Sequence, residues 1–272
     1  MLECVINISE GRSLALIEQV ARPAGHELLD VHVDADHNRS VLTLAGEDAA
    51  RAVAAAAVLS LDLRTHEGVH PRIGVLDVVP FVPLGGQRMA DAIAARDRTA
   101  AWIGSELEVP CFLYGPERSL PEVRRRAFVD LTPDRGPSAP HPRAGAVAVG
   151  ARPVLIAYNL WLAEPDLAQA RRIARALRGP AVRTLGLAVG DEVQVSMNLI
   201  DPLEVGPADV YDAVAALAPI ARAELVGLAP EAVLERIDAT AWERLDLTTD
   251  RTIEARLRAQ GLISASWQAL AP

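Results

Sequence analysis

Residues His66 to His70 read His-Glu-Gly-Val-His and match the H-E-x-x-H pattern of zinc hydrolases. That chemistry needs both imidazoles on one face of a helix, with the glutamate between them acting as a base. Two neighbours disfavour such a helix: Gly68 destabilises it by about 1 kcal/mol relative to alanine, and Pro71 moves the preceding residue away from helical dihedral angles. The next histidine along the chain is His141, which is far from the pair. Zinc hydrolysis is therefore a minor alternative.

A second interpretation makes His70 a general base on a loop. Imidazole has an unperturbed pKa of about 6.5, which suits proton transfer at neutral pH. His70 precedes an apolar, β-branched segment, and Glu67, Arg72 and Asp77 stand close to it in the sequence as possible partners. Loops on a rigid scaffold often carry function. A plainer alternative places both histidines of the motif at the surface, at the end of a helix.

The positive charges of the chain are all guanidinium groups, because its 27 basic residues are all arginine. The absence of lysine excludes Schiff-base chemistry, a lysine that anchors pyridoxal phosphate, and the lysine of a phosphate-binding P-loop. A coding bias towards arginine explains the composition. Any side-chain cation that holds an anionic substrate must then be an arginine or a protonated histidine, and the planar guanidinium suits carboxylates.

Composition also limits the class of protein. The chain has 272 residues and a formal net charge of −9, which argues against general nucleic-acid binding. Cys4 and Cys111 are too few for a disulfide framework, so a reducing compartment is expected. No apolar run reaches the roughly 18 residues of a membrane helix, and the N-terminus lacks the basic region of a signal peptide. These features predict a cytoplasmic protein with no membrane partner.

The elements that position these residues follow from the hydrophobic pattern. Within the first half, strands are predicted over residues 2–9, 26–33, 40–45 and 73–82, and helices over 14–21 and 46–63. A helix over 88–107, a strand over 111–114, a helix over 122–126 and a proline-rich loop over 130–143 follow. Within the second half, strands are predicted over 154–162, 185–189, 193–200 and 224–228, and helices over 165–177, 207–222, 231–237 and 250–260. The order β-α-β-β-α-β occurs twice and predicts an α+β fold of two ferredoxin-like (split βαβ) subdomains.

Ordered stretches along about 230 residues carry a resemblance to a known family. They include the residues Glu3 to Arg12, Asp36 to Val41, His66 to Phe81, Leu113 to Gly115, Gly136 to Ser138, Gly150 to Arg152, Leu155 to Asn159, Gln194 to Asp201 and Glu224 to Leu228. In these stretches the chain resembles the glutamate formimidoyltransferase family, the N-terminal module of formiminotransferase–cyclodeaminase. The resemblance implies two subdomains, over 1–145 and 146–272, packed around a substrate tunnel, and a homodimer.

The resemblance also implies a reaction. The family transfers a formimidoyl group from N-formimidoyl-L-glutamate to N5 of tetrahydrofolate, which is a co-substrate, and no metal is expected. The family's base is the histidine of the His-Pro-Arg triplet, which corresponds to His70. The expected substrate-binding residues are Asn38, Arg39, Arg72, Asp36 and Asn198. The expected folate-binding residues are Gly136, Pro137, Ser138, His141, Gly145, Arg152 and Asn159.

Two other functions stay open beside the zinc hydrolase. One is a diverged folate-dependent one-carbon transferase with another donor or amine acceptor. The other is a folate-binding protein without turnover. In the proline-rich loop, Arg135, Pro140 and Ala144 stand where some family members carry aromatic residues, and His32 stands where some carry aspartate.

Overall fold

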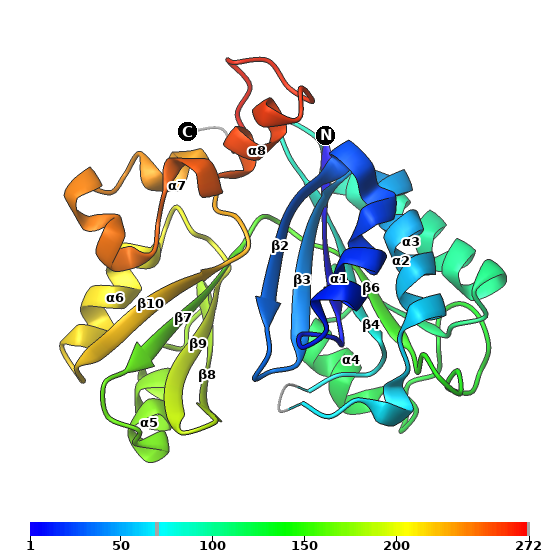
Figure 1. The fold of residues 1–272 in the computed structure, drawn as a ribbon, viewed down its shortest axis with the longest axis horizontal. Coiled ribbons are helices and arrows are strands. Elements are labelled where there is room, and N and C mark those ends of the chain that lie inside the picture. Colours follow the sequence, from blue (N-terminus) through cyan, green and yellow to red (C-terminus); the bar gives the residue numbers. More distant parts are fainter. Residues whose placement is uncertain (69–70, 271–272) are drawn as a thin grey trace. The chain divides into compact units, whose positions relative to one another are not determined.

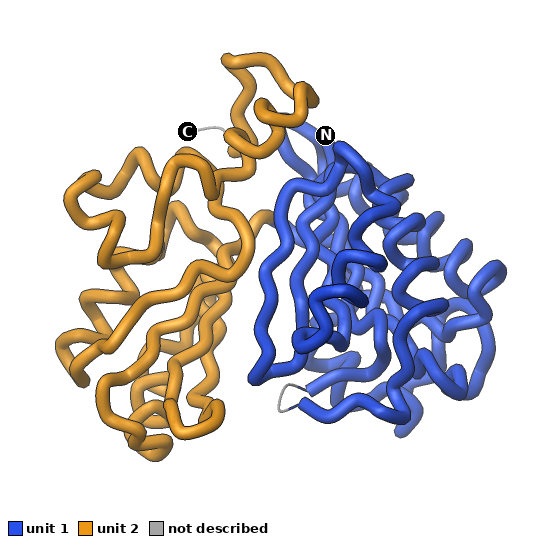
Figure 2. The backbone as a smooth tube through the Cα atoms, in the orientation of Figure 1, with its two compact units in different colours: residues 1–153 blue, residues 154–272 orange. Residues whose placement is uncertain are grey.

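The computed structural model describes residues 1–68 and 71–270. The chain forms two compact units, Met1–Pro153 and Val154–Pro272 (Figure 2). The first unit extends a few residues beyond the boundary expected after residue 145, because the strand β6 (Val147–Ala151) pairs with two strands of that unit.

The described residues of the first unit form a six-stranded sheet with the order β2-β3-β1-β4-β6-β5 (Figure 1). Strand β1 pairs antiparallel with β3 and β4, β2 pairs antiparallel with β3, and β6 lies parallel to β4 and β5. The remaining strands and the helices of the unit are β1 (Leu2–Ile8), β2 (Leu28–Asp34), β3 (Arg39–Ala45), β4 (Leu76–Pro83), β5 (Cys111–Tyr114), α1 (Leu14–Ala21), α2 (Glu47–Ser60), α3 (Met89–Glu106) and α4 (Leu120–Arg126).

Apolar side chains fix the layers of the first unit. On β1, the alternate residues Cys4, Ile6 and Ile8 are fully buried, as expected for a strand with one face on a core. They belong to one cluster with the alanine-rich face of α2 and with residues of α1 and α3, so these three helices cover the same face of the sheet (Figure 1). On the opposite face, Val123 of α4 packs against Val78 and neighbouring strands.

The second unit repeats the order β-α-β-β-α-β. Its described residues form a four-stranded sheet with the order β10-β7-β9-β8, and all neighbouring pairs are antiparallel. The elements are β7 (Ile156–Leu162), α5 (Leu167–Leu177), β8 (Val182–Val189), β9 (Glu192–Leu199), α6 (Pro207–Ala215), β10 (Ile220–Val226), α7 (Glu231–Leu234) and α8 (Ile253–Ala259). Helices α5 and α6 share one core cluster with alternate residues of the strands. The two mixed units confirm the α+β class.

One predicted helix was too long at its C-terminal end, and one strand was not predicted. The helix predicted over 207–222 ends at Ala215, and residues 220–222 open strand β10. Pro219 has no N–H to continue a helix, and its carbonyl instead accepts the N–H of Ala163 beside β7. Strand β6 was not predicted, because its sequence Val-Ala-Val-Gly-Ala lacks bulky alternating residues.

No helix among the described residues combines the length and apolar character needed to cross a membrane.

Candidate functional site

The connection between β2 and β3 contains a histidine held by an aspartate. Oδ1 of Asp34 accepts a hydrogen bond from the backbone N–H of His37 at 2.8 Å. Oδ2 of Asp34 lies 2.5 Å from Nδ1 of the His37 ring. Burial alone would raise the pKa of the Asp34 carboxyl, but the hydrogen bonds from His37 outweigh it and lower that pKa. The sequence patterns did not single out His37, although an aspartate whose side chain accepts a nearby backbone N–H is common in turns.

Asn38 follows in the left-handed conformation, with φ of 48°, and joins three segments. Its side-chain Oδ1 accepts the N–H of Gly11 at 2.9 Å. Its Nδ2 lies 2.8 Å from the carbonyl oxygen of Glu67 and 3.1 Å from Nδ1 of His66. The side chain predicted to bind substrate therefore holds the protein's own loops together.

Two glycines allow these segments to touch backbone to backbone. A Cβ atom at Gly68 would lie 2.5 Å from the carbonyl oxygen of His37, and one at Gly11 would lie 2.0 Å from that of Asp34. Both distances are far below van der Waals contact, so a side chain at either position would push the segments apart. The glycine in the middle of the His-Glu-Gly-Val-His motif is explained by this packing.

A buried carboxylate anchors the segment that follows the motif. Asp77 is 1% exposed, and its Oδ1 accepts the N–H of Ile73 at 2.9 Å. Its Oδ2 accepts hydrogen bonds from Arg39 at 3.0 Å and from Arg124 at 2.6 Å. Arg39 also donates twice to Oδ1 of Asn7, at 3.0 and 2.6 Å. Two guanidinium groups thus share one buried carboxylate, and the expected substrate residue Arg39 is part of this cluster.

Residues 66–68, the described part of the histidine motif, lie outside helices and strands. His70 lies outside the described residues, but the chain on either side of it is held by arginines. Arg72 donates to the carbonyl oxygens of Gly68 at 2.9 Å and of His66 at 3.1 Å. Arg124 donates to the carbonyl oxygen of Pro71. Arg72, just after the motif, and Arg124 of α4 therefore hold the chain on both sides of the predicted base.

The zinc-hydrolase geometry is not formed at His66. A 3₁₀ turn over Leu63–Thr65 ends just before it, and His66 has extended dihedral angles (φ −90°, ψ 125°). Residues 66–68 are not helical, so they cannot place two imidazoles on one helical face. Burial, followed by the positive charge of Arg72, lowers the pKa of His66 below its ordinary value.

The residues at the end of the proline-rich loop lie against the chain just after the histidine motif. The backbones of His141 and Gly145 exchange hydrogen bonds of 2.8 and 2.9 Å. Nδ1 of His141 accepts the N–H of Ala144 at 2.9 Å. Gly145, with φ of 73°, forms a bridge with Gly74, just after the motif. The structure therefore brings part of the predicted folate segment next to the predicted catalytic segment.

The other expected residues are more dispersed. Asp36 is exposed in the β2–β3 connection, and Pro137 and Ser138 are exposed in the proline-rich loop. Gly136, with φ of 78°, packs against Gly104 of α3, and a Cβ there would lie 2.9 Å from that residue's Cα. Arg152, at the end of the first unit, donates to the carbonyl oxygen of Pro153 at 3.0 Å.

Two expected residues belong to the second unit. Asn159 on β7 and Asn198 on β9 share one face of the sheet, because Asn198 is paired with Ala157. Asn159 donates to Oε2 of Glu224 at 3.0 Å, and Trp161 donates to the same oxygen at 2.9 Å. Sequence reasoning assigned no role to Glu224, which the register places directly opposite Asn159.

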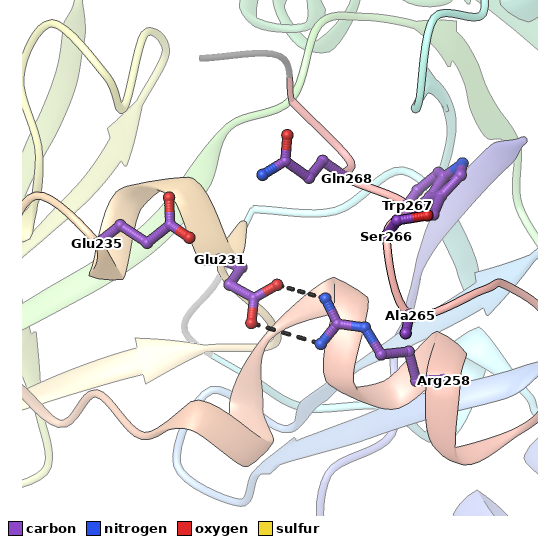
Figure 3. A pocket seen from close by; sticks show the side chains of 7 residues that line it. All are labelled: Glu231, Glu235, Arg258, Ala265, Ser266, Trp267 and Gln268. Carbon is purple, nitrogen blue, oxygen red and sulfur yellow. Dashed lines mark hydrogen bonds and ion pairs between the residues drawn. The ribbon is translucent and has the colours of Figure 1, made fainter.

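A cavity of about 420 Å³ lies elsewhere in the second unit (Figure 3). An ion pair between Glu231 and Arg258, with 2.5 Å between Oε2 and Nη2, forms part of the cavity wall. Trp267 also lines the cavity. None of the residues predicted from the sequence lines this cavity. The motif loops of the first unit remain the candidate site.

Known proteins match this chain over most of its length. The formiminotransferase domain, N-terminal subdomain, matches residues 1–152. A glutamate formimidoyltransferase of Streptococcus pyogenes serotype M1 is 36% identical over 232 residues, which cover 74% of this chain and 78% of that protein. One of Thermoplasma acidophilum is 34% identical over 273 residues, which cover 86% and 89%. The formimidoyltransferase-cyclodeaminase of Sus scrofa is 33% identical over 284 residues, which cover 89% of this chain and 52% of that protein. The chain therefore belongs to the glutamate formimidoyltransferase family of transferases.

Proposed function

We propose that the protein transfers a formimidoyl group from N-formimidoyl-L-glutamate to N5 of tetrahydrofolate, with His70 as the general base. The observation that carries this proposal is the anchoring of the motif loop. Arg72 and Arg124 hold the carbonyl groups on either side of His70, and Arg124 is itself fixed by the buried carboxylate of Asp77. A base must be held within about 3 Å of the proton that it removes, and such anchoring supports that role.

The reaction forms one C–N bond and breaks another, and each of these two steps needs one proton transfer. N5 of the folate attacks the formimidoyl carbon, and His70 takes the N5 proton as the new C–N bond forms. The bond between that carbon and the glutamate nitrogen then breaks, and the nitrogen leaves as an amine after receiving a proton from the imidazolium. Holding donor and acceptor in line supplies a further part of the rate enhancement.

The remaining expected contacts belong to the same proposal. Asp36 would pair with the cationic amidinium of the donor. Arg39 and Arg72 would bind carboxylates of the formimidoyl donor, and Arg152 would contact the folate. Asn38 would act by positioning the loops, and Asn159 and Asn198 by orienting amide or pterin groups. The glycines, Pro137, Ser138 and His141 of the proline-rich loop would line the folate.

We also propose that each unit contains a ferredoxin-like subdomain. The order β2-β3-β1-β4 within the first sheet and the order β10-β7-β9-β8 of the second both support it, because each joins a β-α-β-β-α-β run into an antiparallel sheet. The substrate tunnel, the homodimer and the cytoplasmic location stay predictions from the sequence.

A transfer assay with purified protein tests the proposed function. We expect 5-formimidoyl-tetrahydrofolate to form from N-formimidoyl-L-glutamate and tetrahydrofolate. Calorimetry with tetrahydrofolate supplies the second measurement. Folate binding without turnover would support the binding-protein alternative, and turnover only with another donor would support a diverged transferase.

A further inference from the structure

The orientation of the Asn38 side-chain amide is fixed by two neighbours that cannot exchange roles. The backbone N–H of Gly11 can only donate, so the amide atom 2.9 Å from it is the oxygen. The backbone carbonyl of Glu67 can only accept, so the amide atom 2.8 Å from it is the nitrogen. Reversing the amide would place donor against donor and acceptor against acceptor, which costs both hydrogen bonds.

This orientation determines the proton position on His66. The Asn38 nitrogen lies 3.1 Å from Nδ1 of His66 and can only donate to it. Nδ1 must therefore accept, so it carries no proton. The ring then has its single N–H at Nε2, because a neutral imidazole always protonates one of its two nitrogens. No partner for Nε2 is found within the described part of the chain.

The charges around His66 favour the same neutral ring. Arg72 donates to the backbone carbonyl of His66, and Arg12 contributes a second positive charge. Glu10 opposes them, but burial and the two arginines prevail and lower the pKa of His66. The positive field that disfavours an imidazolium favours an anion at the same place.

We propose that His66 is a substrate-binding residue whose neutral Nε2–H donates a hydrogen bond to a carboxylate of the formimidoyl donor. The inference rests on the proposed function and names a contact within the same site. A carboxylate is the acceptor that fits, because the donor substrate carries carboxylates and because the positive charges of Arg72 and Arg12 act on the ring, opposed only by Glu10. Asn38 then acts as the positioning residue that sets the tautomer.

Nitrogen-15 NMR of the full chain tests this assignment. The chain has six histidines, and the resonances missing in the His66→Gln variant identify His66. We expect the neutral Nε2–H tautomer, and we expect L-glutamate, the product that carries the same carboxylates, to raise the pKa of His66. L-Glutamine is the matched probe and should raise it less. A proton on Nδ1, or no response to L-glutamate, would overturn the proposal.

Kinetics supply a second, independent readout. Glutamine places an amide N–H near the position of Nε2, so His66→Gln should keep the KM for the donor within a few-fold. His66→Ala should raise that KM by about tenfold or more, with a smaller effect on kcat. His26, which is exposed on a 3₁₀ turn, gives the control variant His26→Ala. An unchanged KM in His66→Ala would contradict the proposed contact. Absence of formimidoyl transfer by the wild-type protein would instead contradict the proposed function.

Discussion

Replacing Asp77 by asparagine should strongly destabilise the first unit. The substituted side chain can still accept the N–H of Ile73, but an amide nitrogen at the second position faces Arg39 and Arg124 and cannot accept from them. Two positive charges are then left without their shared carboxylate. The Asp77 side chain is 2% exposed, and those of Arg39 and Arg124 are 16% and 18% exposed, so solvent screens this loss only weakly.

The magnitude follows from burial. Breaking a buried ion pair by removing one partner costs about 3–5 kcal/mol. We take the lower end, about 3 kcal/mol, because the arginines retain partial contact with water and with other acceptors. For a chain of this size about 1 kcal/mol shifts the Tm by about 2–4 °C, so the expected decrease is about 6–12 °C.

Thermal unfolding followed by circular dichroism measures the decrease. Asp130→Asn is the matched control, because the Asp130 side chain is 61% exposed and pairs with Arg126 at the surface, where an ion pair contributes about 0–1 kcal/mol. If the free energy of unfolding of Asp77→Asn lies within about 1 kcal/mol of the wild-type value, the buried carboxylate does not anchor the loop as the geometry indicates.

Three further predictions concern the loops and the cavity. Gly68→Ala should lower kcat/KM by at least about tenfold, because its Cβ would overlap the carbonyl of His37 and displace the motif loop; retained activity with an unchanged fold would contradict this. Folding lowers the pKa of His66, so the unfolded chain binds more protons at that site as the pH falls. The stability that this lowered pKa contributes is therefore fully present above about pH 6.5 and is lost as the pH falls below it. Denaturant unfolding should therefore show the wild type losing stability relative to His66→Gln below that pH, and parallel curves would refute it. Glu231→Gln, in the wall of the second unit's cavity, should change transfer activity less than twofold in the transfer assay; a large loss would assign that cavity to the reaction.

Local sequence patterns predicted the elements with strong periodicity well. Helix α1 and strand β5 have the expected bounds, because the apolar residues of α1 recur at helical spacing and those of β5 form a short continuous run. Strand β6 was missed since its small residues make no distinctive pattern. Gly150 of this strand leaves room for the ring of Tyr114, which occupies the space where a Cβ of Gly150 would lie. That contact exists only after β5 and β6 have paired.

The candidate site shows a similar division. The motif that carries His70 was recognisable from residue types and order, and the structure pairs Gly74, just after it, with Gly145, just after the proline-rich loop. The role of Arg124 was not predictable, because α4 is distant in sequence from Asp77 and their contact depends on the packing of the sheet. The orientation of Asn38 likewise depends on Gly11 and Glu67, which meet only in the folded chain.

The steady-state rate of the His70→Ala variant tests whether His70 is the base for formimidoyl transfer. The assay uses N-formimidoyl-L-glutamate and tetrahydrofolate, with His26→Ala as the control and with calorimetry to verify folate binding in both variants. We predict that kcat falls by about 10²–10⁴-fold in His70→Ala while folate still binds and the circular dichroism spectrum is unchanged. A kcat within a few-fold of that of His26→Ala would mean that His70 is not the base.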